Sequence, residues 1–311
     1  MKIAVSATSF CKNRILRLEL LKHFPKTKFL MSHGVPSYDE LISFYEDAEG
    51  LIVGTEKVDR NLLEQFPHIK IISKYGVGID NIDLNALNNL NIKLGFTAGV
   101  NKLSVAELTL GFMLALSHNM FLKGLPLKSG TWEKNGGIQL SNRSVGIIGC
   151  GNVGYQLIEL LKPFQCKILI NDIEDKQSLI KSHGAKQVSK DEIFEKCQFI
   201  TLHLPLTNQT KYLINHERLK RMRNDAFIVN TARGQLINQL ALKQALIDNQ
   251  IAGAALDVYE IEPPVDIEFL SLPQLITTPH IGGNSVEAQL NMGRSAIKHL
   301  VSFFKNETTI T

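Results

Sequence analysis

Three glycines stand where a short apolar run gives way to a helical pattern. The run covers residues 144–148, and it is followed by Gly149, Gly151 and Gly154 and then by apolar positions at helical spacing as far as Leu161. Glycine allows a tight turn and a close approach of the backbone to a pyrophosphate, and the first turn of a helix presents unpaired N–H groups to it. Unless these glycines only form a turn, the unit predicts a dinucleotide-binding site.

A carboxylate follows the glycines at the distance that such a site requires. The next apolar run, residues 167–171, ends at Asp172, about 20 residues beyond the turn. An acid at this strand end accepts hydrogen bonds from ribose hydroxyls and repels the 2′-phosphate of NADP, and no Arg or Lys follows before Lys176. The pattern therefore predicts NAD as the cofactor, with a merely solvated strand end as the alternative for Asp172.

Polar side chains also follow three later apolar runs. Because the carboxyl ends of parallel strands meet at one edge of a sheet, we expect these side chains to converge there. They are Arg233 after residues 226–230, Asp257 and Glu262 after residues 251–256, and His280 after residues 275–278.

Three of these residues are suited to hydride transfer at a carbonyl that lies next to a carboxylate. His280 titrates near neutral pH and can give or take the proton on oxygen. Glu262 beside it would raise the pKa of the imidazole, and Arg233 would hold the substrate carboxylate with a planar fork. Singly they could be an ion pair, a loop residue and a structural histidine, but together with a dinucleotide turn they favour catalysis.

Short apolar runs alternate with helical patterns along the whole chain, which is typical of parallel sheets with crossover helices. In the first part we expect strands at 2–5, 28–30, 51–53 and 69–73 and helices at 13–23, 37–47 and 60–66. After residue 143 we expect strands at 144–148, 167–172, 199–204, 226–230, 251–257 and 275–277 and helices at 153–161, 217–222 and 239–248.

Two further predicted helices indicate where the chain divides into domains. The helix predicted at 103–118 is apolar on more than one face, so we expect it at a domain junction or at a subunit interface. The polar stretch 128–137 then connects it to the glycine strand. The last helix, 285–304, has apolar positions at helical spacing and is expected to pack on the first domain, which would make that domain discontinuous.

The composition is that of an ordinary α/β protein of two domains. The 311 residues carry a net charge of only +4 without basic blocks, so neither nucleic acid nor a membrane surface is indicated as a partner. The four cysteines lie far apart and predict neither a metal site nor a disulfide framework. With no secretory signal and no long apolar run, a cytoplasmic location is expected.

Several motifs together resemble the D-isomer-specific 2-hydroxyacid dehydrogenases, in particular phosphoglycerate dehydrogenase-like members. The resemblance spans residues 74–284. It rests on the glycine turn with Asp172, on the runs 75–83, 105–108, 230–234 and 256–258, on Glu262-Pro263, and on the run 278–283.

The resemblance implies two doubly wound parallel-sheet domains, with a Rossmann cofactor domain inserted into a flavodoxin-like substrate domain. The substrate-binding domain would comprise residues 1–98 and 285–311 and the NAD-binding domain residues 99–284, with NAD in the cleft between them and a homodimer formed through the cofactor domains. The residues expected to line the dinucleotide are Gly149, Gly151, Asn152, Val153, Gly154, Asp172, Leu204, Pro205, Thr231, Ala232, Asp257 and Gly282.

Arg233 and His280 would contact the substrate, and so would the first-domain loop of Lys74, Gly76, Val77 and Gly78, whose backbone N–H groups could bind its carboxylate. Gly76 and Gly78 could also serve only as turn formers, and Asn101 could form either a turn or a cleft contact.

The substrate implied is a small D-2-hydroxy acid or 2-keto acid, and Lys74 points to 3-phosphoglycerate. Gly54 stands where phosphoglycerate enzymes carry an arginine, however, and the chain ends soon after its last helix without their regulatory domain. A reductase of glyoxylate, hydroxypyruvate or a bulkier 2-keto acid is therefore an alternative. A non-catalytic interaction protein that responds to NAD is another.

Overall fold

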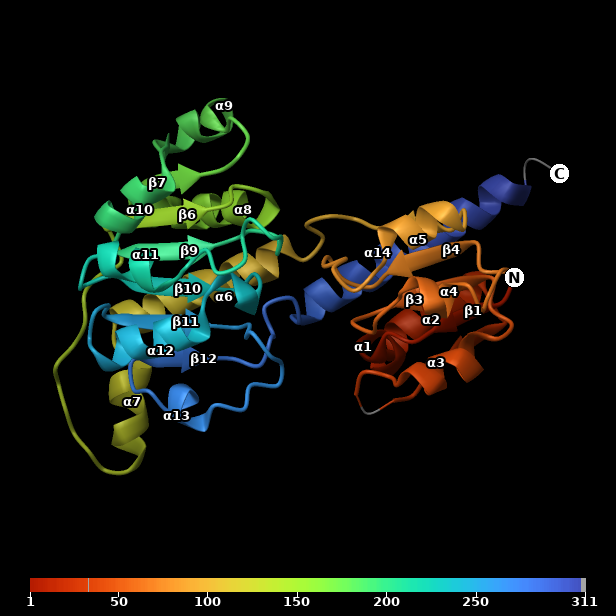
Figure 1. The fold of residues 1–311 in the computed structure, drawn as a ribbon, viewed down its shortest axis with the longest axis horizontal. Coiled ribbons are helices and arrows are strands. Elements are labelled where there is room, and N and C mark those ends of the chain that lie inside the picture. The colour runs from red at the N-terminus through yellow and green to blue at the C-terminus, as the bar shows by residue number, and fades with distance from the viewer. Residues whose placement is uncertain (33, 309–311) are drawn as a thin grey trace. The chain divides into compact units, whose positions relative to one another are not determined.

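A computed structural model of the chain describes residues 1–32 and 34–308. It divides into two compact units, the first formed by Met1–Asn101 with Gly283–Thr311 and the second by Lys102–Gly282. The boundaries expected from the sequence, after residues 98 and 284, lie a few residues away from these. Each unit contains one parallel sheet covered by helices, which confirms the predicted α/β class (Figure 1).

Unit 1 contains a five-stranded sheet in the order β2-β1-β3-β4-β5, in which all neighbouring strands are parallel. The buried strands β1 and β3 are continuous apolar runs and β4 begins with two isoleucines, as expected where helices cover both faces of a sheet. The strands are β1 (Ile3–Val5), β2 (Thr27–Phe29), β3 (Gly50–Val53), β4 (Ile71–Lys74) and β5 (Lys93–Gly95).

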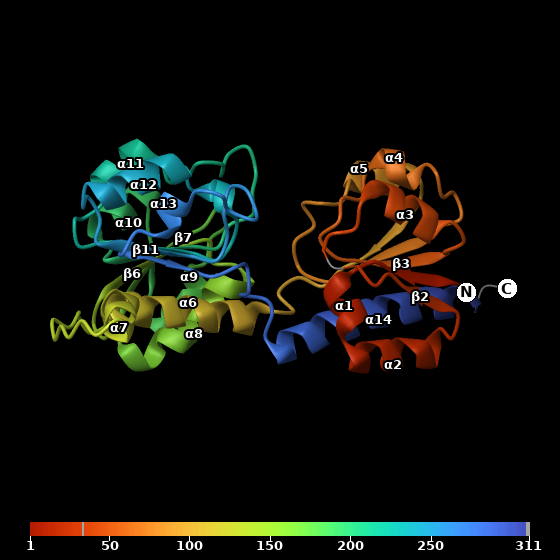
Figure 2. The ribbon, with the colours of Figure 1, turned by 90° about the horizontal axis from the view of Figure 1, so that it is seen from below.

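Six helices cover this sheet. On one face, α1 (Thr8–Lys12), α2 (Arg14–His23) and α14 (Val286–Thr308) form one core cluster with β1. On the other, α3 (Tyr38–Tyr45), α4 (Arg60–Leu63) and α5 (Leu84–Asn89) form a second, and Figure 2 shows the two layers. The predicted packing of the last helix on the first domain is confirmed.

Close packing of two helices explains how α14 is held. Gly293 lies where α14 meets α2, and a Cβ atom at this position would be 2.3 Å from Leu16 Cδ1. Leu16 and Leu300 are fully buried in the same cluster. A small residue at this contact lets the backbones of α14 and α2 approach each other. Helix α14, which follows unit 2 in the sequence, thereby packs into the core of unit 1.

Unit 2 contains a seven-stranded parallel sheet in the order β12-β11-β10-β9-β6-β7-β8. The chain begins in the middle at β6, moves outward on one side and then restarts on the other side at β9, so the order reverses next to β6. Ligands bind at such a reversal in open α/β sheets. The strands are β6 (Ser144–Ile148), β7 (Lys167–Asn171), β8 (Lys186–Gln187), β9 (Phe199–Leu202), β10 (Phe227–Asn230), β11 (Gly253–Leu256) and β12 (Leu275–Thr277).

Helices cover both faces of the second sheet as well (Figure 2). One face carries α6 (Lys102–Ser117) and α8 (Asn152–Leu161), and the other carries α10 (Lys190–Lys196), α11 (His216–Arg221), α12 (Gln239–Ile247) and α13 (Ile267–Leu270). The remaining helices are α7 (Met120–Lys128) and α9 (Gln177–Ile180), with short 3₁₀ turns at Lys162–Phe164, Lys181–His183 and Gly234–Leu236.

The elements that sequence patterns did not predict have at most nine residues each, and they are α1, α5, β5, α7, α9, β8, α10 and α13. Helix α6 buries one face in its own unit, against α8 and the sheet, and leaves residues such as Leu103 exposed. No single helix in the described part of the chain is both long and apolar enough to span a bilayer. Helices α6 and α7, bent by 70° where they meet, satisfy those criteria only as a pair.

The packing of α14 yields a stability prediction. Leu300→Ala removes a fully buried side chain from the core that α14 shares with β1 and α2, and should lower the free energy of unfolding of unit 1 by about 2–5 kcal/mol. Val286→Ala on the exposed start of the same helix should change it by less than about 0.5 kcal/mol. Urea unfolding followed by circular dichroism measures both, and equal midpoints for the two variants would contradict this packing.

Candidate active site

The carboxyl edge of the unit 2 sheet gathers the residues that the sequence singled out. In the strand order, the loops after β12, β11, β10, β9, β6 and β7 follow one another along this edge. They carry, in turn, His280, Asp257, Arg233, the segment 203–205, the glycine turn and Asp172. Six segments that are far apart in the sequence therefore form one row.

The glycine turn is shaped by close contacts that exclude side chains. Gly149 has φ +97°, and a Cβ atom there would lie 2.4 Å from the carbonyl oxygen of His203. A Cβ atom on Gly154 would lie 2.2 Å from the carbonyl oxygen of Gly149. Helix α8 begins directly after Gly151 with no side chain capping its first N–H groups, and the space beside Gly151 is open. This cradle fits the pyrophosphate of a dinucleotide.

Asp172 is joined to the glycine turn. One carboxylate oxygen accepts a hydrogen bond of 2.7 Å from the Cys150 N–H and the other one of 3.0 Å from the Glu174 N–H. The side chain remains partly exposed and has lone pairs left for further donors. The contact of Asp172 with ribose hydroxyls stays a prediction. Such a contact requires a carboxylate beside the glycine turn, and Asp172 lies there.

The segment after β9 lies against the same turn. Leu204 and Pro205 were expected to line the dinucleotide, and Leu204 Cδ2 lies 3.0 Å from where a Gly149 Cβ would be. His203 was not predicted, although it also follows a strand of this edge. Its Nε2 lies 3.0 Å from Thr201 Oγ1, and burial lowers its pKa to about 3, so its imidazole is neutral.

Arg233 lies in a turn whose backbone is held from within. The buried side chain of Asn230 accepts a hydrogen bond of 3.1 Å from the Ala232 N–H and donates one of 2.9 Å to the Arg233 carbonyl. One guanidinium nitrogen of Arg233 donates to the Ala232 carbonyl at 2.7 Å. The side chain is partly exposed.

His280 and Glu262 form the ion pair that the sequence predicted. His280 Nδ1 lies 2.7 Å from Glu262 Oε2, and the imidazole is 51 % exposed. The hydrogen bond that His280 donates to Glu262 raises the pKa of His280 against the opposing effect of burial. Burial would raise the pKa of Glu262, but the hydrogen bond and charge of His280 outweigh it and hold that pKa below its usual value. The Tyr259 N–H also donates to Glu262, at 3.0 Å.

The loop that carries His280 is fastened by Asp257. This carboxylate, 1 % exposed, accepts hydrogen bonds from the Thr278 hydroxyl and from the Ile281 and Gly282 N–H groups, at 2.5, 2.8 and 2.8 Å. His280 has φ +53°, a left-handed conformation that is uncommon for residues other than glycine. Asp257 therefore supports the loop on both sides of His280, and its predicted contact with the dinucleotide remains a prediction.

In unit 1, the predicted substrate loop follows β4. The Lys74 ammonium is only 5 % exposed, and it donates to the Gly54 carbonyl and, at 2.8 Å, to the Asn81 side chain. Gly76 has φ +126°. Within the described residues, the N–H groups of Gly76, Val77 and Gly78 donate to no protein acceptor. The loop amides are thus available to a ligand, whereas Lys74 ties two loops together.

The loop after β3 contains a buried carboxylate that was not predicted. Glu56 is 1 % exposed; it accepts hydrogen bonds from the Gly54 N–H at 2.9 Å and from the Ser6 hydroxyl. Gly54 is the position at which an arginine was noted as missing. Asn101 at the end of the same unit is buried as well, and its side-chain oxygen has no hydrogen-bond partner among the described residues.

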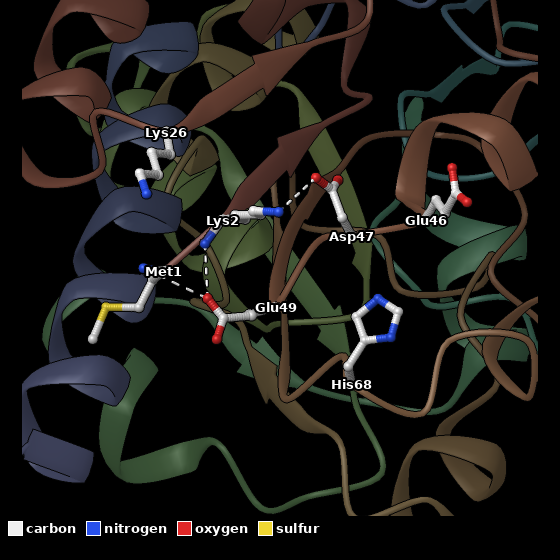
Figure 3. A pocket seen from close by; sticks show the side chains of 7 residues that line it. All are labelled: Met1, Lys2, Lys26, Glu46, Asp47, Glu49 and His68. Atoms are coloured by element: carbon white, nitrogen blue, oxygen red, sulfur yellow. Dashed lines mark hydrogen bonds and ion pairs between the residues drawn. The ribbon is translucent and has the colours of Figure 1, made fainter.

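A surface hollow in unit 1 lies at the opposite end of its strands (Figure 3). Lys2 is paired with Asp47 at 3.1 Å, and the N-terminal ammonium with Glu49 at 3.6 Å. Hydrogen bonds from Lys28 and Lys2 lower the pKa of Asp47 to about 2. This edge holds the amino ends of the strands, whereas ligands of open α/β sheets bind at the carboxyl ends, so we assign it no catalytic role.

The arrangement at the carboxyl edge of unit 2 is suited to acid–base chemistry beside a bound dinucleotide. It provides a polarised histidine, a guanidinium in a clamped turn and a pyrophosphate cradle. Among residues 1–32 and 34–308, no group of three or more His, Cys, Asp or Glu side chains is placed to hold a metal ion.

Comparison with known proteins agrees with this geometry. A family model described as the NAD binding domain of D-isomer specific 2-hydroxyacid dehydrogenases matches residues 110–282. The chain is 38 % identical to D-3-phosphoglycerate dehydrogenase of Methanocaldococcus jannaschii over 86 % of its length and spans about half, 52 %, of that relative. It is 35 % identical to hydroxypyruvate reductase of Thermotoga maritima, over 84 % of this chain and 87 % of the relative.

A solved structure shows the same fold. The NAD-dependent formate dehydrogenase of Staphylococcus aureus in complex with NAD has a TM-score of 0.83 and 29 % identity, covering 99 % of this chain and 96 % of that one. The matched family domain contains the glycine turn, Asp172, Arg233, Glu262 and His280. The chain belongs to the D-isomer specific 2-hydroxyacid dehydrogenases, and its second unit is their NAD-binding domain.

Proposed function

We propose that the chain interconverts a small, unphosphorylated 2-keto acid and the corresponding D-2-hydroxy acid, with NAD as the cofactor. The observation that carries this proposal is the His280–Glu262 pair at 2.7 Å, which lies with Arg233 on the carboxyl edge of the NAD-binding sheet. This edge therefore contains both a proton donor of raised pKa and a cationic group suited to a carboxylate.

The glycine turn and the start of α8 fit a pyrophosphate, and from this we infer which residues would hold NAD. The first N–H groups of α8, at Asn152 and Val153, would bind the pyrophosphate, and Asp172 the ribose. Leu204 with Pro205, Thr231 with Ala232, and Asp257 with Gly282 follow along the same edge toward His280. When bound, NAD supplies or accepts the hydride.

The chain's own residues supply the proton and the orientation. Because Nδ1 of His280 is engaged with Glu262, we assign to Nε2 the protonation of the carbonyl oxygen and the deprotonation of the hydroxyl. Glu262 stabilises the imidazolium and fixes the ring orientation. Arg233 would bind the substrate carboxylate through two parallel N–H donors, a geometry that lysine cannot provide.

The first unit favours an unphosphorylated substrate. The Lys74 ammonium already donates to Gly54 and Asn81, and the carboxylate of Glu56 is buried in the same loop. A phosphate brought to Gly54 would meet that negative charge, whereas the N–H groups of Gly76, Val77 and Gly78 suit a substrate carboxylate. The identity to a phosphoglycerate dehydrogenase supports 3-phosphoglycerate as a second candidate.

A homodimer and a cytoplasmic location are also proposed. Helix α7 and the stretch after it expose a series of large apolar side chains, which supports a second copy covering this face. They are Met120, Phe121, Leu125, Leu127 and Trp132. The four cysteines are free thiols, as is typical of proteins in a reducing compartment.

The substrate assignment is tested by cofactor turnover. NADH oxidation with glyoxylate and hydroxypyruvate should exceed, in kcat/KM, the reduction of NAD by 3-phosphoglycerate. His280→Ala should lower kcat by at least about 100-fold with little change in NADH affinity, and Arg233→Ala should mainly raise KM for the keto acid. His216→Ala on the exposed start of α11 is the control. Preference for 3-phosphoglycerate would overturn the substrate class, and wild-type turnover in His280→Ala would overturn the role of His280.

The ion pair predicts a pH dependence. Reduction needs protonated His280, so kcat/KM should be maintained at low pH and fall as the pH rises through the raised pKa of His280. Glu262→Gln removes the charge that raises this pKa, and the falling limb should move to lower pH. The limb should stay near its original position in Glu262→Asp. An unchanged limb in Glu262→Gln would show that another group supplies the proton.

The dimer is tested by replacing exposed apolar residues of α7. Phe121→Glu combined with Leu125→Glu places two charges in the proposed interface and should shift the protein from dimer to monomer in sedimentation velocity. Leu240→Glu, on a still more exposed side chain of α12, should leave the mass unchanged. A wild-type monomer, or a dimer that survives the double substitution, would refute this interface.

A further inference from the structure

We propose that a buried pair of threonine hydroxyls, Thr109 on α6 and Thr231 after β10, positions the turn that carries Arg233. The inference rests on the proposed function, in which Arg233 binds the substrate carboxylate. Thr109 would then be a positioning residue for the reaction, although it belongs to a helix on the face of the sheet.

The geometry of the pair is defined by two contacts. Thr109 Oγ1 lies 2.9 Å from Thr231 Oγ1 and 2.8 Å from the Val105 carbonyl oxygen. Thr109 is fully buried and Thr231 is 9 % exposed. The pair is therefore shielded from water, which would otherwise compete for both hydroxyls.

The direction of the hydrogen bonds follows from the number of protons. A threonine hydroxyl has one proton to donate, and that of Thr109 is donated to the Val105 carbonyl, which has no proton of its own. Thr231 must therefore donate to Thr109. A substitution of Thr109 that removes its oxygen leaves this buried donor without an acceptor.

Other contacts also hold the turn that carries Arg233, and the threonine pair adds a link to α6. Asn230 closes the turn through hydrogen bonds with Ala232 and Arg233. A Cβ atom on Gly234 would lie 1.9 Å from the carbonyl carbon of Tyr259, so the turn abuts that backbone. The hydrogen bond between Thr231 and Thr109 ties the turn to α6, on the face of the sheet that carries α6 and α8.

Small movements of Arg233 should affect turnover strongly. A displacement of about 1 Å in a substrate-positioning group can reduce the rate by about 100-fold. A single neutral hydrogen bond contributes only about 1 kcal/mol to stability. Removal of the Thr109 hydroxyl should therefore reduce catalytic efficiency far more than it reduces stability.

The first test compares substitutions on α6. Thr109→Val should lower kcat/KM for the 2-keto acid at least about tenfold, mainly through KM, and this loss should exceed any loss of NADH affinity that follows from the contact with Thr231. Thr109→Ser, which keeps the hydroxyl, should restore most of the wild-type value. Ser117→Ala removes another buried hydroxyl of α6, one that donates to the Leu114 carbonyl of the same helix, and should leave kcat/KM unchanged.

A double-mutant cycle tests whether Thr109 acts through Arg233. In the Arg233→Ala background, Thr109→Val should change the remaining kcat/KM by less than about twofold. If the full loss persists there, if Thr109→Ser is as impaired as Thr109→Val, or if the defect lies in NADH affinity, the inference is wrong. Thr109→Ala replaces Thr109→Val if the valine variant does not fold.

The same measurements separate failure of this inference from failure of the proposed function. If the wild-type chain reduces no 2-keto acid, or if Arg233→Ala retains full efficiency, the proposed function fails, and the assignment of Thr109 fails with it. If wild type and Arg233→Ala behave as expected while Thr109→Val matches wild type, only the positioning role is refuted.

Discussion

The parallel register of the second sheet is the constraint on which the site depends. Parallel strands end at the same edge, so each strand contributes a loop to one line. The order β12-β11-β10-β9-β6-β7 places the His280–Glu262 pair at one end of this line and Asp172 at the other. The strands themselves are nearly all apolar, and the chemistry lies in the residues that follow them. This separation allows the core to be packed without burying the catalytic groups.

Backbone contacts then determine how far each loop can move. The glycine turn lies against the His203 carbonyl, and the Arg233 turn abuts Tyr259. The His280 loop is held by three hydrogen bonds to the buried carboxylate of Asp257. These supports are buried groups that meet no substrate. Precise placement of a few exposed side chains thus requires a larger number of residues beneath them, which is the general cost of a preorganised site.

Sequence patterns were sufficient for the features that depend on local order. The α/β class, the glycine turn and the polar residues at strand ends follow from periodicity and from glycine chemistry. The short helices α5 and α13 lack enough turns to show a pattern. Helix α7 lies between the helix expected at 103–118 and the connection expected at 128–137, where no element was predicted. Lys74 donates to Gly54, which is 20 positions away in the sequence, and Thr109 contacts Thr231, which is 122 positions away. No local sequence pattern predicts contacts over such separations.

Two histidines at the same edge show why position alone does not define an acid–base group. His203 and His280 both follow strands of the unit 2 sheet. His203 is partly buried beside a neutral hydroxyl, and burial lowers its pKa to about 3, which keeps the ring uncharged. His280 faces the carboxylate of Glu262, which raises its pKa despite partial burial. Desolvation disfavours an imidazolium, and only a nearby negative charge reverses that effect. The carboxylate, rather than the location of the ring, therefore distinguishes His280, the proposed acid–base group, from His203.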